Sequence, residues 1–174
     1  MVTEININGA FHNVWVFFLI YNIDRFDYCN ALLYCVTESN ISRLQRVQNS
    51  LARAACAALY RASSAGLRRS LHWFPVKERL THKVAAMAFT ARFHHKPIYL
   101  AELLVDYVSS RALISADKLL LVEPRTKTLT TSRAFRVAGS HISNSLPLSI
   151  RSAPFTRNFR DQLKTFLFDK AYNS

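Results

Sequence analysis

Glycine and proline are scarce in this chain, which has three glycines and five prolines among its 174 residues. Turn-rich β-sandwiches depend on such residues, so their scarcity favours helices. Half of the residues are hydrophobic, which excludes a disordered composition and suffices for one globular core. We therefore predict a mainly α fold, an irregular bundle of about five to six helices with a small β-hairpin or an ordered loop near residues 119–132.

The chain also lacks paired cysteines. Cys29, Cys35 and Cys56 are odd in number and contain no CxxC pair, which argues against a disulfide framework. We expect a reduced, intracellular setting, nuclear or cytoplasmic, and not a secreted protein. A zinc site would have to combine distant residues such as His94 and His95 with two of the cysteines, and those spacings match no structural zinc site. We predict neither a metal site nor a cofactor.

Long hydrophobic runs are missing as well. The apolar run from Val14 to Ile20 is shorter than the roughly 20 residues of a membrane-spanning helix. No small-residue cleavage site follows it, so a signal peptide is disfavoured. A buried helix or strand is the favoured interpretation, with a weak membrane anchor as the alternative. We treat residues 1–24 as an apolar lead-in and residues 25–174 as a single helical domain.

Acidic residues are nearly absent from the most basic part of the chain. Between Arg43 and Lys96, eleven Lys and Arg residues face one acid, Glu78, which gives +10 of the net charge of +12. An excess of this size indicates an anionic partner, with nucleic acid favoured over an anionic membrane surface. We expect RNA or DNA backbone as the partner, contacted mostly without sequence choice, and no small-molecule substrate.

The basic stretch begins with an amphipathic pattern. Ser39 and Asn40 are typical N-cap residues, and Glu38 suits a helix amino terminus. At 100° per residue the following apolar positions fall in an arc of about 120°, and four arginines fall in a separate arc of about 80°. The apolar set is Ile41, Leu44, Val47, Leu51, Ala55, Ala58 and Leu59, with Gln48 as a neutral neighbour, and the arginines are Arg43, Arg46, Arg53 and Arg61. One helix with a core face and an arginine stripe is predicted.

A second long helix follows. Ser and Gly in residues 63–66 end the first helix, and residues 67–71 form at most a short turn. Pro75 suits the first position of a helix, with Trp73 and Phe74 before it as a staple, and the helix runs to about His95. A helix that is apolar on two sides is usually central in its domain. Its two apolar sides are Leu80, Val84, Met87, Ala88 and Ala91, and nearly opposite them Phe89 and Phe93.

Three further helices are predicted. A short one follows Pro97 from Ile98 to Val108, and another covers residues 133–144. A final amphipathic helix follows Pro154. Its apolar face holds Phe155, Phe159, Leu163, Phe166 and Leu167, flanked by Arg157, Arg160 and Lys164.

The candidate nucleic-acid contacts lie in the basic stretch, because Lys and Arg neutralise phosphates there without reading bases. They are Arg43, Arg46, Arg53, Arg61, Arg68, Arg69, Lys77, Arg79 and Lys83. Trp73 could stack on a base, but its apolar neighbours favour packing in the core. We expect His94 and His95 to cap a helix end and Tyr99 to pack.

Seven phrases occur in one order: DYCNALLY (27–34), ISRLQRVQNSLAR (41–53), LRRSLHWFPVKERLTHK (67–83), PIYLAELL (97–104), SADKLLLVEPRTKT (115–128), SRAFRVA (132–138) and NSLPLSIRSAP (144–154). This order resembles the carboxyl-terminal part of the reverse-transcriptase polyprotein of non-LTR (LINE-type) retrotransposons, of the jockey-like and chicken-repeat-like kind. The resemblance covers about residues 25 to 172. Ser143 stands where that family usually has Trp, and Cys35 where it usually has Gly.

The resemblance implies the thumb of a polymerase and the segment beyond it, whose helices grip the backbone of the template–primer duplex. Polymerase chemistry needs paired carboxylates that hold two metal ions. The family's Tyr/Phe-x-Asp-Asp hairpin is missing here, and the nearest imitation, Asp24 with Asp27, is better explained by helix capping or by pairing with Arg25. We therefore expect a non-catalytic fragment, with the missing palm domain as a further partner. The alternatives are a helical protein-interaction module and a pseudogene remnant without selected activity.

Overall fold

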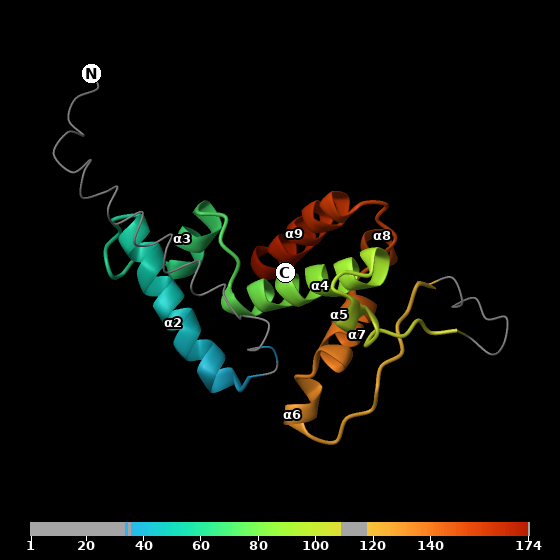
Figure 1. Ribbon diagram of the computed structural model, residues 1–174. Coiled ribbons are helices and arrows are strands. Elements are labelled where there is room, and N and C mark those ends of the chain that lie inside the picture. Colours follow the sequence, from blue (N-terminus) through green and yellow to red (C-terminus); the bar gives the residue numbers. More distant parts are fainter. Residues whose placement is uncertain (1–33, 35, 109–117, 174) are drawn as a thin grey trace.

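The computed structural model describes residues 34, 36–108 and 118–173, and within them the fold is mainly helical, as predicted (Figure 1). The helices are α2 (Glu38–Ala55), α3 (Ser64–Ser70), α4 (Val76–His94), α5 (Ile98–Ala101), α6 (Leu129–Ser132), α7 (Phe135–Ser145), α8 (Leu148–Arg151) and α9 (Thr156–Tyr172). No helix in the described part of the chain is both long and apolar enough to span a membrane. The predictions for Val14–Ile20, for Asp24 with Asp27, and for Cys29 and Cys35 lie outside the described residues.

Helix α4 is the centre of the fold. Helices α7 and α9 pack against it, α9 above and α7 below in the view of Figure 1. The Phe89 ring of α4 stacks on the Phe159 ring of α9, with centroids 4.0 Å apart and an interplanar angle of 17°. Val84 and Ala85 of α4 join the same buried cluster. The prediction of a central helix is confirmed, but of its second apolar side only Phe89 is buried, because Phe93 near the end of the helix is 43% exposed.

Helix α2 is joined to the start of α4 by two glutamines. The backbone N–H of Val76 donates to Gln45 Oε1 at 3.0 Å, and Gln48 Nε2 donates to the Phe74 carbonyl at 2.7 Å. Gln45 Nε2 also donates to Gln48 Oε1 at 2.9 Å. Pro75, the N-cap of α4, forms no side-chain capping bond, so Gln45 serves as that cap from a neighbouring helix. Gln48, expected to be a neutral neighbour of the core face, is in fact one of its buried residues.

The predicted ends of α2 need correction. Its N-cap is Thr37, so Ser39 and Asn40 lie in the first turn. It stops at Ala55, because Ala57 adopts a left-handed backbone with φ of 46° and turns the chain away. Leu59, predicted on the core face, therefore lies beyond the helix and is 83% exposed. Ala58 and Arg61 also lie beyond it, and Val47, inside the helix, is 50% exposed.

Helix α3 differs from its prediction too. It spans Ser64–Ser70, whereas residues 63–66 were expected to break a helix. Ser63 is its N-cap, and the Ser63 hydroxyl accepts a hydrogen bond from the Gly66 N–H at 3.4 Å. Serine favours N-caps as well as loops, so the same residues that suggested a break begin a helix.

The region after α4 also differs from the prediction. Helix α5 ends at Ala101, not at Val108, and residues 105–107 pair with residues 120–122 through an isolated antiparallel bridge between Asp106 and Leu121. Residues 119–122 thus pair with an earlier segment rather than forming a hairpin with residues 126–132, where α6 lies. Arg92 of α4 contacts both paired segments. Its Nη1 donates to the Leu119 carbonyl at 2.8 Å, and its Nη2 lies 2.6 Å from Asp106 Oδ1.

The carboxyl-terminal part packs on α4 much as predicted. Helix α7 spans Phe135–Ser145, and Phe159, Leu163 and Leu167 of α9 are buried. Phe155, expected on the same face, is instead the exposed N-cap of α9. Ser143 lines a void of about 10 Å³ between α4, α7 and α9.

The short helix α8 was not predicted, and it carries a buried arginine. Arg151 Nη1 donates to the Lys118 carbonyl at 2.6 Å, which ties α8 to the start of the paired segment. Burial lowers the pKa of the Arg151 guanidinium, and the charge of Arg92 lowers it further. This arginine therefore supports the fold from inside.

Candidate nucleic-acid interface

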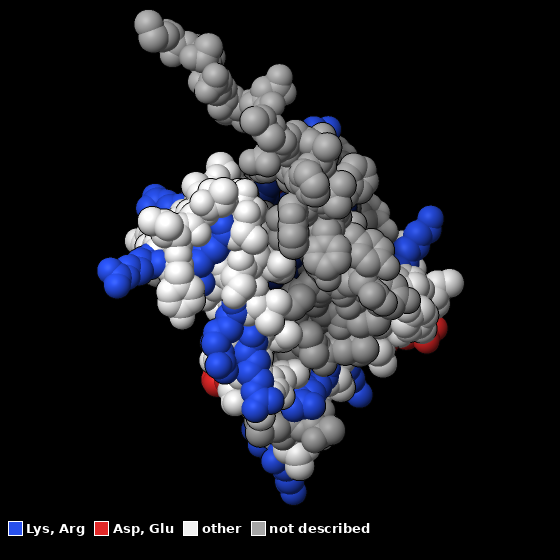
Figure 2. Space-filling model, turned by 90° about the vertical axis from the view of Figure 1, so that its left-hand side faces the viewer, with Lys and Arg blue, Asp and Glu red and all other residues white. Residues whose placement is uncertain are grey.

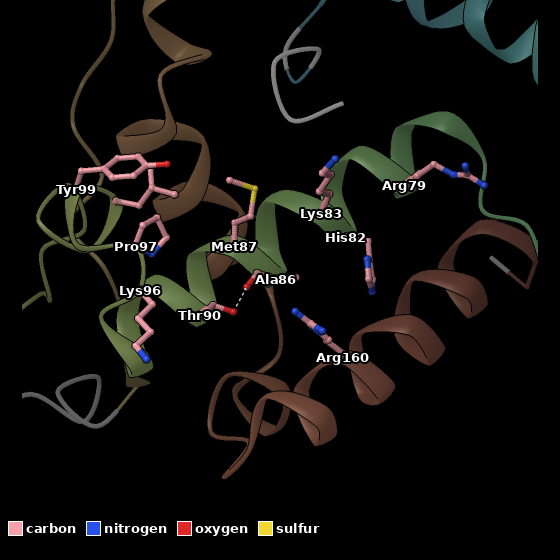
Figure 3. Close-up of a pocket in the computed structure, with 11 residues that line it drawn as sticks. Arg79, His82, Lys83, Ala86, Met87, Thr90, Lys96, Pro97, Tyr99 and Arg160 are labelled. Carbon is pink, nitrogen blue, oxygen red and sulfur yellow. Dashed lines mark hydrogen bonds between the residues drawn. The ribbon is translucent and has the colours of Figure 1, made fainter. Parts of the chain in front are cut away.

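A basic groove lies where α4, α5 and α9 meet (Figure 3). It has a volume of about 590 Å³, and the described residues that line it include four Lys and Arg side chains and no carboxylate. The lining residues are Arg79, His82, Lys83, Ala86, Met87, Thr90, Lys96, Pro97, Tyr99, Leu100 and Arg160. An anionic ligand is the kind of molecule that such a lining attracts.

Helix α4 supplies one wall of the groove. Its lining positions recur every three or four residues from Arg79 to Thr90, the spacing that places side chains on one side of a helix. The Thr90 hydroxyl donates to the Ala86 carbonyl at 2.8 Å, so its polar end is turned toward its own helix. The cationic members of this wall are Arg79 and Lys83.

Helix α9 supplies the opposite side. Figure 3 shows His82 of α4 pointing toward α9 and Arg160 of α9 pointing toward α4. Arg160 directly follows Phe159, whose ring is stacked on Phe89 in the core. The buried aromatic pair therefore fixes the position of the cation across the groove.

The end of the groove is formed by the turn from α4 to α5. His95 caps α4 in a left-handed backbone with φ of 51°, which turns the chain into Pro97 and α5. Leu100 is buried and anchors α5, while Tyr99 is 67% exposed, in contrast to its predicted packing role. His94, also predicted to cap a helix end, instead forms a side-chain hydrogen bond of 2.6 Å between its Nε2 and the Thr156 hydroxyl at the start of α9.

Two of the nine predicted contacts, Arg79 and Lys83, line this groove. Lys77, two residues before Arg79, forms an exposed ion pair of 3.4 Å with Glu38 of α2. Sequence reasoning missed Lys96 and Arg160 as site residues. Lys96 lies in the predicted basic stretch, and Arg160 flanks the apolar face of the last helix. Their positions in the sequence do not show that they line one groove, because only the packing of α9 on α4 brings them together.

The four arginines of the predicted stripe do not form one continuous row on α2. Arg43 and Arg46 are exposed on the helix, whereas Arg61 lies past its end. The Arg53 guanidinium is half-buried and lies over the Tyr60 ring, 5.4 Å from its centroid. Figure 2, seen from the side of α2 and α3, shows Lys and Arg in several separate groups with little acidic surface between them.

Arg68 and Arg69 are neighbours in the sequence, but one is buried and the other is exposed. Arg68 is buried, and its Nη1 donates to Asn49 Oδ1 of α2. Arg69 is exposed, and its Nη2 donates to Asn173 Oδ1 beyond α9 at 3.1 Å. Arg68 joins α3 to α2, so its guanidinium does not face the solvent where a phosphate would lie.

Trp73 is half-buried in the turn before α4. The Tyr172 hydroxyl donates to the Trp73 carbonyl at 2.6 Å, so the end of α9 is fastened to this turn. Within the described residues, no group of three or more His, Cys, Asp or Glu side chains is arranged to hold a metal ion.

Comparison with models of protein families, with curated proteins and with solved structures found no match for this chain.

Proposed function

We propose that this chain binds the phosphate backbone of RNA or DNA through the groove between α4, α5 and α9, mostly without sequence choice. The single observation that carries the proposal is the lining of the groove, which has four cationic side chains from α4, the turn after α4 and α9, and no carboxylate among the described residues that line it. Contacts from Lys and Arg to phosphates provide affinity and register and carry no sequence information. Arg43 and Arg46, exposed on α2, add basic surface outside the groove.

We further propose that the chain is a non-catalytic part of a LINE-type retrotransposon RNA-directed DNA polymerase, acting inside the cell. The seven ordered phrases support this origin, and the phrases around Gln45 and Pro75 form the joint between α2 and α4. In that setting the basic groove would hold template or primer backbone beside a palm domain that supplies the catalytic carboxylates.

The test is a salt titration of binding to a short RNA–DNA duplex and to a single strand of the same length, followed by fluorescence anisotropy. The wild-type chain is compared with a variant in which Arg79, Lys83, Lys96 and Arg160 are all Gln. Each lost phosphate contact lowers the slope of log K against log salt by about 0.9 on B-form duplex DNA and about 0.7 on single strands. We expect the slope to fall by about 3 if all four residues contact phosphates.

The matched control removes the same charge outside the groove. Arg125, Lys127, Arg133 and Arg136 are exposed and do not line it, and all four are replaced by Gln. We expect this variant to keep most of the wild-type slope. An equal loss in both variants would show that net charge, and not the groove, governs binding. Absence of any salt-dependent binding at low salt would refute the proposal, provided that cooperative thermal unfolding shows the chains to be folded.

A further inference from the structure

The end of the groove near α5 combines a cationic wall with an exposed aromatic ring. Figure 3 shows the Tyr99 ring beside Pro97, at the end of the groove away from Arg79. Tyr99 is 67% exposed, although Leu100 next to it is buried. The backbone that holds this ring is therefore fixed by the core while the ring itself faces the solvent.

The floor near this ring is apolar. Ala86, Met87, Pro97 and Leu100 contribute to the lining, together with the four cations. A duplex presents phosphates and sugars to a groove and keeps its base faces stacked inside. A phosphate placed against an apolar floor would lose water without gaining a partner. Base faces gain from the same floor, because every base has a flat π-surface that stacks on aromatic and apolar side chains.

The length of the groove suits more than one nucleotide. From Arg79 to Thr90 the lining follows α4 for about 16 Å at 1.5 Å per residue. Arg79 and Lys83 lie one turn apart near its start, and Lys96 lies near Tyr99 at the other end. Arg160 points toward the middle of α4 from α9. Cations along both sides of an apolar floor with an aromatic ring at one end are typical of grooves that hold single strands.

We infer that the groove binds a single-stranded segment of nucleic acid, with phosphates on Arg79, Lys83, Lys96 and Arg160 and one base stacked on Tyr99. This inference rests on the proposed function, since it names the form of nucleic acid that the same groove takes. It assigns Tyr99 a role that the basic residues cannot fill, because phosphate contacts alone do not distinguish a single strand from a duplex.

The test compares wild type with Tyr99→Ala on an oligouridine single strand and on a duplex of equal length at one salt concentration. We expect Tyr99→Ala to weaken binding to the single strand about tenfold, near the lower end of what one stacked base contributes. Binding to the duplex should be unchanged, and Tyr99→Phe should restore the single-strand affinity because it keeps the ring. The matched control is Tyr107→Ala, which removes an exposed tyrosine outside the groove and should leave both affinities unchanged.

Equal affinity of wild type and Tyr99→Ala for the single strand would overturn this inference while leaving backbone binding intact. Equal loss on single strand and duplex would also overturn it, since the ring would then support the groove without stacking on a base. Failure of the proposed function looks different, because neither form of nucleic acid would then bind in a salt-dependent way. A salt slope for oligouridine that falls with Lys96→Gln and stays unchanged with Tyr99→Ala is the expected pattern.

Discussion

The glutamine joint between α2 and α4 gives the sharpest prediction about stability. Gln48 is buried, and its Nε2 is the donor to the Phe74 carbonyl, while Gln45 accepts from the Val76 N–H. Replacing either residue by Met keeps the length of the side chain and nearly the same helix propensity. The substitution therefore removes the hydrogen bonds and little else.

The expected cost follows from the groups that are left without partners. Gln48→Met leaves the Phe74 carbonyl unsatisfied in a partly buried place, and we expect a loss of about 1–3 kcal/mol in the free energy of unfolding. Gln45→Met removes a helix cap at Val76, for which about 1 kcal/mol is typical. Because the two glutamines also bond each other at 2.9 Å, the double variant should lose at least about 0.5 kcal/mol less than the sum.

Urea unfolding followed by far-ultraviolet circular dichroism measures these losses for the wild type, the two single variants and the double variant. Gln162→Met serves as the control, since Gln162 is exposed on α9 and the same substitution there should change stability by less than about 0.5 kcal/mol. The reasoning is refuted if Gln48→Met behaves like this control, or if the two single losses add fully.

Two further predictions concern the contacts of α9. Phe159→Ala should cost about 3–5 kcal/mol in the same urea experiment, because it empties a buried site and removes the stack on Phe89; a loss below about 1.5 kcal/mol would contradict the packing described. Tyr172→Phe should cost about 1 kcal/mol at neutral pH, since it removes the hydrogen bond to the Trp73 carbonyl. Burial raises the pKa of Tyr172, with a hydrogen bond from Arg68 opposing the rise, so the stabilisation by the neutral hydroxyl is full below about pH 10 and is lost as pH rises through the folded-state pKa. Unfolding measured between pH 9 and pH 11 should therefore show a steeper loss for wild type than for Tyr172→Phe, and parallel curves would contradict it.

The long helices were predictable because their apolar residues repeat at helical spacing. Two apolar sides identified α4 as central, and one apolar face marked α9 from Phe159 onward. The end of α2 was not predictable in this way. Ala55 to Ala58 are alanines apart from Cys56 and continue a helix by propensity, and only the left-handed backbone at Ala57 ends it.

The groove was only half predictable for a different reason. Arg79 and Lys83 share one helix, so their spacing places them together, but Arg160 reaches them only through the packing of α9 on α4. Arg68 and Arg151 show the opposite problem. Charged residues are rarely buried, so sequence reasoning favoured the surface for Arg68 and gave Arg151 no role, yet both are buried with their guanidinium groups bonded to neighbouring segments.

The amide joint between α2 and α4 has a consequence for experiments at different ionic strengths. Its hydrogen bonds join neutral groups, which dissolved ions screen far less than they screen exposed charges. The exposed Lys77–Glu38 pair also links these helices, but such pairs contribute at most about 1 kcal/mol. Helix α2 should therefore keep its position on α4 from low to high salt. A decline in nucleic-acid affinity over that range then reports the release of counterions, and not a change in the shape of the protein.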